Sequence, residues 1–132
     1  MVQHSYETII IGAGPAGLAT ALNLIKCGVT DILVIEKHVF PRYKCCAGYI
    51  TAKTKKAYEE LGLNADDCHY SLIKDFKILY NLRSRLKIDN KFLFTNRYID
   101  RVELDYKFFR LATERGIAVL DGVKINWHDI EK

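Results

Sequence analysis

The pattern of apolar and polar positions opens with a run of β-branched residues, Ile9 to Ile11, typical of a buried parallel strand. A glycine-rich turn follows, and apolar residues then recur at helical spacing from Leu18 to Ile25. A second apolar run, Ile32 to Ile35, ends at an acidic residue, Glu36. The pattern predicts a βαβ unit over residues 6–36, long enough for a right-handed crossover.

The next part of the chain changes its periodicity twice. Residues 37–50 show no repeat of apolar positions and contain proline and glycine, which predicts a loop. Thr51 is a candidate cap for a helix that Gly62 closes. From about residue 71 to 95, short segments alternate with a period of two, which predicts an antiparallel ribbon inserted into the fold.

The last third of the chain predicts a return to the parallel sheet. Asp100 is expected to cap a helix over residues 101–115, and residues 117–120 are expected to form a third parallel strand. A further strand is predicted to begin at Val123 and to run to Trp127. The fold class is therefore α/β, a Rossmann-like dinucleotide-binding fold with a parallel sheet and a small antiparallel insertion. In the helix predicted over residues 101–115, the apolar face consists of Val102, Leu104, Phe108, Leu111 and Ala112.

The glycines of the first turn have distinct physical tasks. Gly12 allows the tight turn out of the strand, Gly14 lacks the Cβ that would block a pyrophosphate, and Gly17 lets the helix pack closely. Pro15 suits the first helical turn, where its missing N–H would have no intrahelical partner. With Ala16, these residues form a helix N-terminus whose free N–H groups attract phosphate. The alternative is a purely structural glycine turn in an ordinary α/β domain.

Glu36 completes the motif, because an acid at the end of the second strand, about 20 residues on, is expected to bind a ribose diol. Its charge would repel a 2′-phosphate, which disfavours NADP at this site. The residues themselves leave FAD and NAD both open. Arg42 and Lys44 follow the acid closely, so they can reach the phosphates or ribose of a cofactor, and the planar guanidinium of Arg42 suits phosphate. The alternative for Arg42 is a surface residue beside a proline turn.

Composition narrows the function classes. The 132 residues have the length of about one domain, and a net charge of +4, scattered among acidic residues, argues against a nucleic-acid partner. A net charge of this size is compatible only with weak peripheral contact with an anionic membrane. No apolar run reaches the ~20 residues needed to span a bilayer. Cys27, Cys45, Cys46 and Cys68 form no CxxC pair or zinc-like spacing, so we expect no metal site and a reducing, cytoplasmic setting.

Three segments resemble one family. They are the βαβ motif, the loop FPRYKCCAG (residues 40–48), which is similar to a P-R-x-K-x-C-G-G loop, and DRVELD (residues 100–105), which is similar to D-R-x-x-F-D. Together they resemble the N-terminal part of the geranylgeranyl reductase family of FAD-dependent oxidoreductases, within the p-hydroxybenzoate hydroxylase-like fold. Ala47 replaces a usual glycine of that family, and Leu104 a usual phenylalanine.

The resemblance implies FAD as cofactor and reduction of carbon–carbon double bonds in isoprenoid chains. It places Cys46 near the isoalloxazine, and it makes Arg101 an FAD contact, with an ion pair to Asp105 as the alternative. Val123 or Ile125 would offer a backbone amide to adenine by the same resemblance, although a core strand residue is the favoured interpretation of either. No catalytic residue is assigned. The expected cofactor contacts are Gly12, Gly14, Pro15, Ala16, Gly17, Glu36, Lys37, Arg42, Cys46, Ala47, Gly48, Arg101 and Val123.

The chain is expected to be a single, incomplete FAD-binding domain over residues 1–132. Members of the family are several hundred residues long, so we expect a missing C-terminal half or a second chain to supply the substrate pocket. The domain alone is then not expected to turn over substrate. Relatives of the fold that hydroxylate or halogenate remain alternatives, as does a dinucleotide-binding module without catalysis. An unrelated NAD-dependent enzyme is disfavoured by the loop over residues 40–48.

Overall fold

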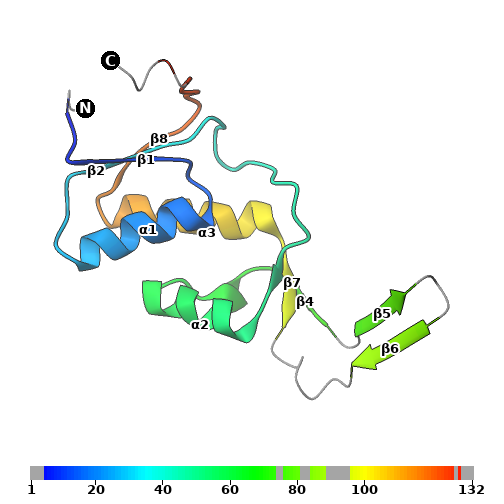
Figure 1. Ribbon diagram of the computed structural model, residues 1–132. Helices are drawn as coiled ribbons and strands as arrows, with labels where there is room; N and C mark the ends of the chain where they lie inside the picture. The colour runs from blue at the N-terminus through cyan, green and yellow to red at the C-terminus, as the bar shows by residue number, and fades with distance from the viewer. Residues whose placement is uncertain (1–4, 74–75, 81–83, 89–95, 127, 129–132) are drawn as a thin grey trace.

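The computed structural model describes residues 5–73, 76–80, 84–88, 96–126 and 128, with only the backbone of 76–80 and 84–88. Figure 1 shows the arrangement of its elements. The helices are α1 (Pro15–Lys26), α2 (Ala52–Leu61), the 3-10 turn η1 (Ala65–Asp67) and α3 (Arg101–Glu114). The strands are β1 (Thr8–Ile11), β2 (Ile32–Ile35), β3 (Tyr49–Ile50), β4 (Tyr70–Leu72), β5 (Phe76–Tyr80), β6 (Ser84–Ile88), β7 (Arg97–Ile99) and β8 (Ala118–Leu120).

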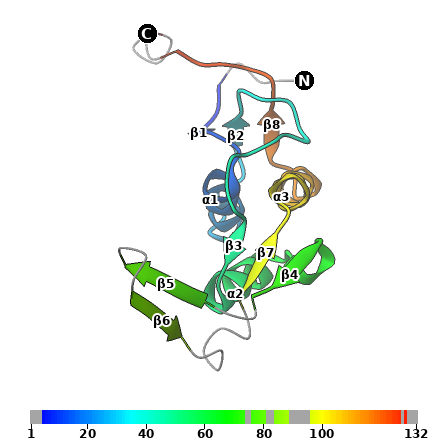
Figure 2. The same ribbon diagram turned by 90° about the vertical axis from the view of Figure 1, so that its right-hand side faces the viewer.

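A parallel sheet in the order β1-β2-β8 carries the site. Ile11 pairs with Ile35, and Ile35 pairs with Leu120, so the carboxyl ends of all three strands meet at one edge. Helices α1 and α3 lie side by side on one face of this sheet (Figures 1 and 2). The predicted βαβ unit, the third parallel strand and the α/β fold class are confirmed.

The core begins between this sheet and the two helices and continues beyond them to α2 and η1, where it includes Leu61 and Ala65. Each fully buried aliphatic or aromatic side chain there contributes about 1.5–3 kcal/mol by its removal from water. Leu104 is 1% exposed, so the core accommodates leucine at the position where the geranylgeranyl reductase family, which the sequence resembles, usually has phenylalanine. The helical core positions are Leu18, Ala21 and Leu22 of α1 and Leu104, Phe108 and Ala112 of α3.

Side-chain caps fix the starts of α2 and α3, as predicted. The Asp100 carboxylate accepts hydrogen bonds from the amides of Val102 and Glu103, at 2.7 and 3.4 Å. The Thr51 hydroxyl accepts one from the Thr54 amide at 3.2 Å. Caps of this kind stabilise a helix by about 1 kcal/mol.

Two antiparallel elements lie away from the parallel sheet, at the end of the molecule that contains α2 (Figure 1). Strands β5 and β6 form the predicted ribbon, with Phe76 opposite Ile88 and Tyr80 opposite Ser84. The predicted segment over residues 91–94 lies outside the described residues. In a second sheet, of order β3-β7-β4, strand β4 contains the first two residues of the predicted ribbon, whereas β3 and β7 were not predicted as strands. Strand β3 takes the last two residues of the predicted loop over residues 37–50.

The predicted strand from Val123 is wrong for residues 123–126, which are not in a strand. The chain turns at Gly122, whose φ is 76°. The Val123 amide still donates to the carbonyl oxygen of Glu36, at 2.9 Å, but no regular pairing follows. Among the described residues, no helix is both long enough and apolar enough to cross a bilayer.

Candidate cofactor-binding site

The glycine turn joins β1 to α1 at the carboxyl edge of the parallel sheet. The Gly12 amide donates to the Ile35 carbonyl oxygen at 2.7 Å, which ties the turn to β2. Gly14 is the N-cap of α1 and supplies no side-chain cap, and the first turn of the helix contains no acidic residue. The N-terminal amides of α1 are therefore not capped by a side chain of that helix, and they lie where the helix dipole favours an anion.

Glu36 lies over this turn at the end of β2, and its side chain is 7% exposed. Its Oε2 accepts a hydrogen bond from the Ala13 amide at 3.0 Å, and its Oε1 accepts one from the His38 amide at 3.2 Å. Oε2 also accepts from Arg42 Nη2 at 3.4 Å, whereas Oε1 has a second lone pair that can accept a ribose hydroxyl. The turn therefore orients the acid that the motif requires.

Arg42 is buried, so its interpretation as a surface residue beside a proline turn is wrong. Its Nη2 lies 3.4 Å from Oε2 of Glu36 and donates at 3.5 Å to the Ala13 carbonyl oxygen. Its guanidinium carbon lies 4.9 Å from the centre of the Phe40 ring. The loop itself is anchored because the Phe40 amide donates to the Asp121 carboxylate at 2.8 Å. Arg42 Nε is buried without a hydrogen-bond partner among the described residues.

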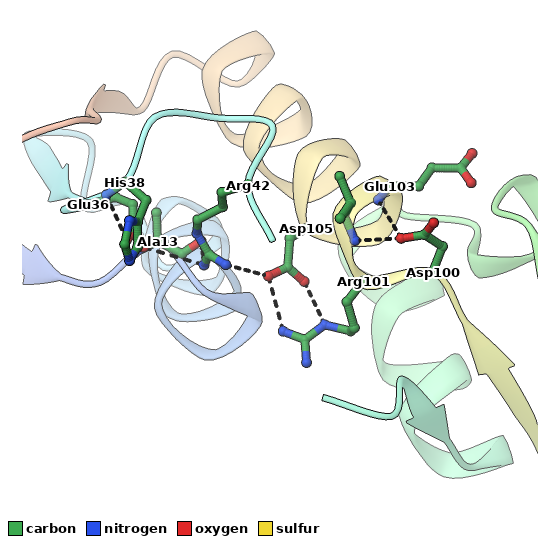
Figure 3. Close-up of polar contacts among 9 residues, drawn as sticks. Ala13, Glu36, His38, Arg42, Asp100, Arg101, Glu103 and Asp105 are labelled. Carbon is green, nitrogen blue, oxygen red and sulfur yellow. Dashed lines mark hydrogen bonds and ion pairs between the residues drawn. The ribbon is translucent and has the colours of Figure 1, made fainter. Parts of the chain in front are cut away.

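Asp105 of α3 lies on the other side of Arg42 and is fully buried (Figure 3). Its Oδ2 accepts from Arg42 Nη1 at 3.1 Å. Arg101 donates to the same carboxylate through Nε at 2.8 Å and Nη2 at 3.0 Å. The hydrogen bonds to Asp105 raise the pKa of Arg101. Burial of the guanidinium lowers this pKa, but less strongly, so it remains above its ordinary value. The expected ion pair between Arg101 and Asp105 is thus present.

A cavity of about 670 Å³ opens at the carboxyl edge of the parallel sheet, within the 300–1,000 Å³ usual for cofactor sites. Basic groups predominate in its wall, since Lys44 and Lys124 join the arginines there and Glu36 is the acidic residue. The cavity brings together most of the predicted cofactor residues. They are Gly12, Gly14, Pro15, Glu36, Lys37, Arg42, Arg101 and Val123.

A smaller cavity of about 240 Å³ contains Cys46 and Gly48, and it shares Pro15 and Arg101 with the larger one. The Gly48 amide donates to Cys46 Sγ at 3.4 Å. This bond and the nearby Arg101 guanidinium hold the pKa of the exposed Cys46 thiol below its ordinary value. The predicted residues Ala16, Gly17 and Ala47 line neither cavity.

Several wall residues were not predicted as contacts. His38, Tyr43 and Cys45 belong to the loop that the sequence singled out, and Lys124 follows β8 without a local signal. Ile125, named beside Val123 as a candidate adenine contact, also lines the cavity. Val123, which also lines the cavity, is 37% exposed, so its interpretation as a core residue is wrong.

The residues present fit a dinucleotide. A Cβ added to Gly14 would lie 3.7 Å from Arg42 Nη2, between the helix N-terminus and the guanidinium that frame the cavity. Amides at the helix start, a buried arginine with an unpaired Nε and a ribose-binding acid are the groups that a pyrophosphate and a ribose need.

Comparison with known proteins decides between the dinucleotides. Residues 5–107 match the family described as FAD binding domain. The chain belongs to this family. FAD is therefore the cofactor of this FAD-binding domain.

Two curated relatives illustrate the similarity. The domain is 36% identical to an uncharacterised protein of Methanosarcina barkeri over 132 residues, which covers 96% of this chain and 32% of that protein. It is 29% identical to a menaquinone reductase of Mycobacterium tuberculosis, which covers 93% and 30%. The chain thus spans about a third of the length of these relatives.

Solved structures confirm the fold. A flavin-dependent brominase superimposes with a TM-score of 0.68 at 25% identity, covering 86% of this chain and 28% of that one. A geranylgeranyl bacteriochlorophyll reductase-like protein of Thermoplasma acidophilum superimposes with a TM-score of 0.70 at 18% identity, covering 92% and 32%.

Proposed function

We propose that this FAD-binding domain serves an oxidoreductase that reduces carbon–carbon double bonds in isoprenoid chains. The observation that carries the proposal is the place of the loop over residues 40–48, which resembles the P-R-x-K-x-C-G-G loop of geranylgeranyl reductases. It runs from Arg42 in the wall of the larger cavity to Cys46 in the wall of the smaller one. The loop therefore follows the path expected of an extended cofactor from its ribose and phosphates toward its ring.

The chain contributes binding and orientation to this reaction. Glu36 accepts ribose hydroxyls, the start of α1 binds phosphate through its amides, and Arg42 adds a charge-assisted contact. Bound FAD supplies the hydride chemistry. Cys46 and Gly48 form the wall where the ring would lie.

A segment beyond these residues is proposed to complete the substrate pocket. Ile9 and Ile11 of β1 are 55% and 58% exposed, whereas Ile10 packs toward the helices. Parallel sheets are normally covered on both faces, so this apolar face fits a covering segment. About two-thirds of each relative's length lies outside the matched part, and we propose that the corresponding segment of this protein lies in the same polypeptide or in a second one.

The proposed setting is the cytoplasm, with peripheral contact to a membrane that holds the lipid-like substrate. Cys27, Cys45, Cys46 and Cys68 are all free, as expected in a reducing compartment. The basic wall of the larger cavity would favour an anionic headgroup near the site.

A second candidate is a halogenating flavoenzyme. It is favoured by a 29% identical chlorinase of Pseudomonas fluorescens that acts on a carrier-bound pyrrole-2-carbonyl group, and by the brominase structure. A module that binds FAD without catalysis is the outcome if neither reaction occurs.

The test follows the flavin of the FAD-loaded chain after anaerobic reduction with dithionite. The proposal is supported if the reduced flavin is reoxidised when a geranylgeranyl lipid is added. Mass spectrometry should then show that the lipid has gained two hydrogen atoms for each double bond reduced. The assay is repeated with the remaining two-thirds of the Methanosarcina barkeri relative supplied as a second chain. If the flavin stays reduced in the presence of the lipid in both assays, the proposed reductase activity is contradicted. Chlorination of a pyrrole in the presence of oxygen and chloride would support the second candidate.

A further inference from the structure

One buried carboxylate joins two arginines from different parts of the chain. Asp105 is fully buried, and it accepts from Arg42 of the loop at 3.1 Å and from Arg101 of α3 at 2.8 and 3.0 Å. Figure 3 shows Asp105 between the two guanidinium groups. Both arginines line the larger cavity, and Arg101 also lines the smaller one, whereas Asp105 lines neither.

We propose that Asp105 is a positioning residue for FAD, which holds Arg42 and Arg101 in the cavity walls before the cofactor binds. A free arginine side chain has many rotamers, and binding is weaker when those rotamers must be ordered at that moment. The inference depends on FAD binding by this family and is independent of the substrate proposed above.

The geometry explains why this position needs a carboxylate. Arg101 takes both oxygens of Asp105, and Arg42 shares Oδ2 with it. An asparagine would keep one acceptor oxygen and would turn an NH₂ group toward a guanidinium, which is also a donor. At least one arginine would then be released. The charges also balance, because Glu36 and Asp105 compensate Arg42 and Arg101.

A second consequence can be measured without FAD. The Gly48 amide and then the Arg101 guanidinium lower the pKa of the Cys46 thiol. If Asp105 holds Arg101 in place, loss of the carboxylate releases Arg101, and the pKa of Cys46 rises toward its ordinary value. Loss of the negative charge with Arg101 still in place would instead lower that pKa further, since the Asp105 charge by itself raises it.

The experiment compares Asp105→Asn with Glu114→Gln in the 132-residue chain. Glu114 forms an i,i+4 pair with Arg110 on the same helix, but both side chains are more than half exposed. FAD titration should show about tenfold weaker binding for Asp105→Asn and unchanged binding for Glu114→Gln. The pH dependence of Cys46 alkylation, read by mass spectrometry in a Cys45→Ser background, should shift upward for Asp105→Asn alone.

A triple variant separates positioning from a general structural role. Asp105→Asn, added to a chain that already carries both Arg42→Met and Arg101→Met, should weaken FAD binding no further, because Asp105 acts through these arginines. Additive weakening there, or an unchanged or lowered pKa of Cys46 in Asp105→Asn, would overturn the proposal. A folded wild-type chain that does not bind FAD would overturn the proposal as well.

If Asp105→Asn does not fold by circular dichroism, Arg101→Lys tests the same claim. Lysine keeps the charge but cannot hold both oxygens of Asp105 in a planar fork. Weaker FAD binding together with a raised pKa of Cys46 supports the proposal, and wild-type values of both overturn it.

Discussion

The backbone of Gly17 lies so close to Gly12 that a Cβ at residue 17 would overlap the Gly12 carbonyl oxygen. Gly14 differs, because a Cβ there would lie at an ordinary contact distance, 3.7 Å, from Arg42 Nη2. Two glycines of one motif are therefore needed for different reasons. Gly17 serves the packing of α1 on the turn, whereas Gly14 leaves space at the helix N-terminus that frames the cavity.

This difference predicts opposite results for two substitutions. Gly14→Val should abolish FAD binding and leave helicity by circular dichroism close to that of the wild type. Gly17→Ala should lower the free energy of unfolding by more than about 1 kcal/mol, because backbone must move to admit the methyl group. FAD binding by a folded Gly14→Val chain would contradict the phosphate-cradle assignment.

Glu36→Gln tests the ribose contact. Glutamine keeps the shape and an acceptor for the Ala13 amide but loses the charge, so FAD affinity should fall by about tenfold, as expected for a charged acceptor. Isothermal titration calorimetry with FAD measures the change. Affinity equal to that of the wild type would exclude a ribose role for Glu36.

Gly48→Ala should destabilise the loop that carries Cys46. Gly48 has a φ of 72°, and a Cβ there would overlap the Ile99 carbonyl oxygen of β7. The left-handed conformation alone costs about 1–3 kcal/mol for a residue other than glycine, and the overlap adds to it. Urea unfolding measures the loss. The exposed neighbour Ala47 provides the control, since Ala47→Gly should change stability by less than about 1 kcal/mol.

The stability of the domain should depend on Glu103 at low pH. The His69 amide, followed by the His69 ring, lowers the pKa of Glu103 from 4.5 to about 2. Because the folded pKa is depressed, the stabilisation is present above pH 4.5 and disappears as the pH falls toward 2. Glu103→Gln should therefore lower the melting temperature at pH 7 but not at pH 2. An equal difference at both pH values would contradict this linkage.

Local patterns allowed the parallel half of the fold to be predicted. Ile9 to Ile11 and Ile32 to Ile35 form strands because β-branched runs around a glycine turn specify a βαβ unit. Asp100 and Thr51 were recognised as caps because a cap depends on residues two or three positions away.

Non-local contacts could not be predicted in this way. Strand β7 pairs with β3 and β4, which lie far from it in sequence, and three-residue strands have too few positions to show a period. The burial of Arg42 depends on Asp105 of a distant helix. A weak signal existed, since Asp105 adjoins the apolar face of α3 and follows Arg101 by one turn.

The most direct test of the FAD assignment is a fluorescence titration of the purified 132-residue chain with FAD, using NAD as competitor. The geometry of Glu36, the start of α1 and Arg42 predicts saturable binding of a dinucleotide, and the family match predicts that this dinucleotide is FAD, which NAD does not displace. A folded chain that fails to bind FAD, or that releases it to NAD, would contradict the account.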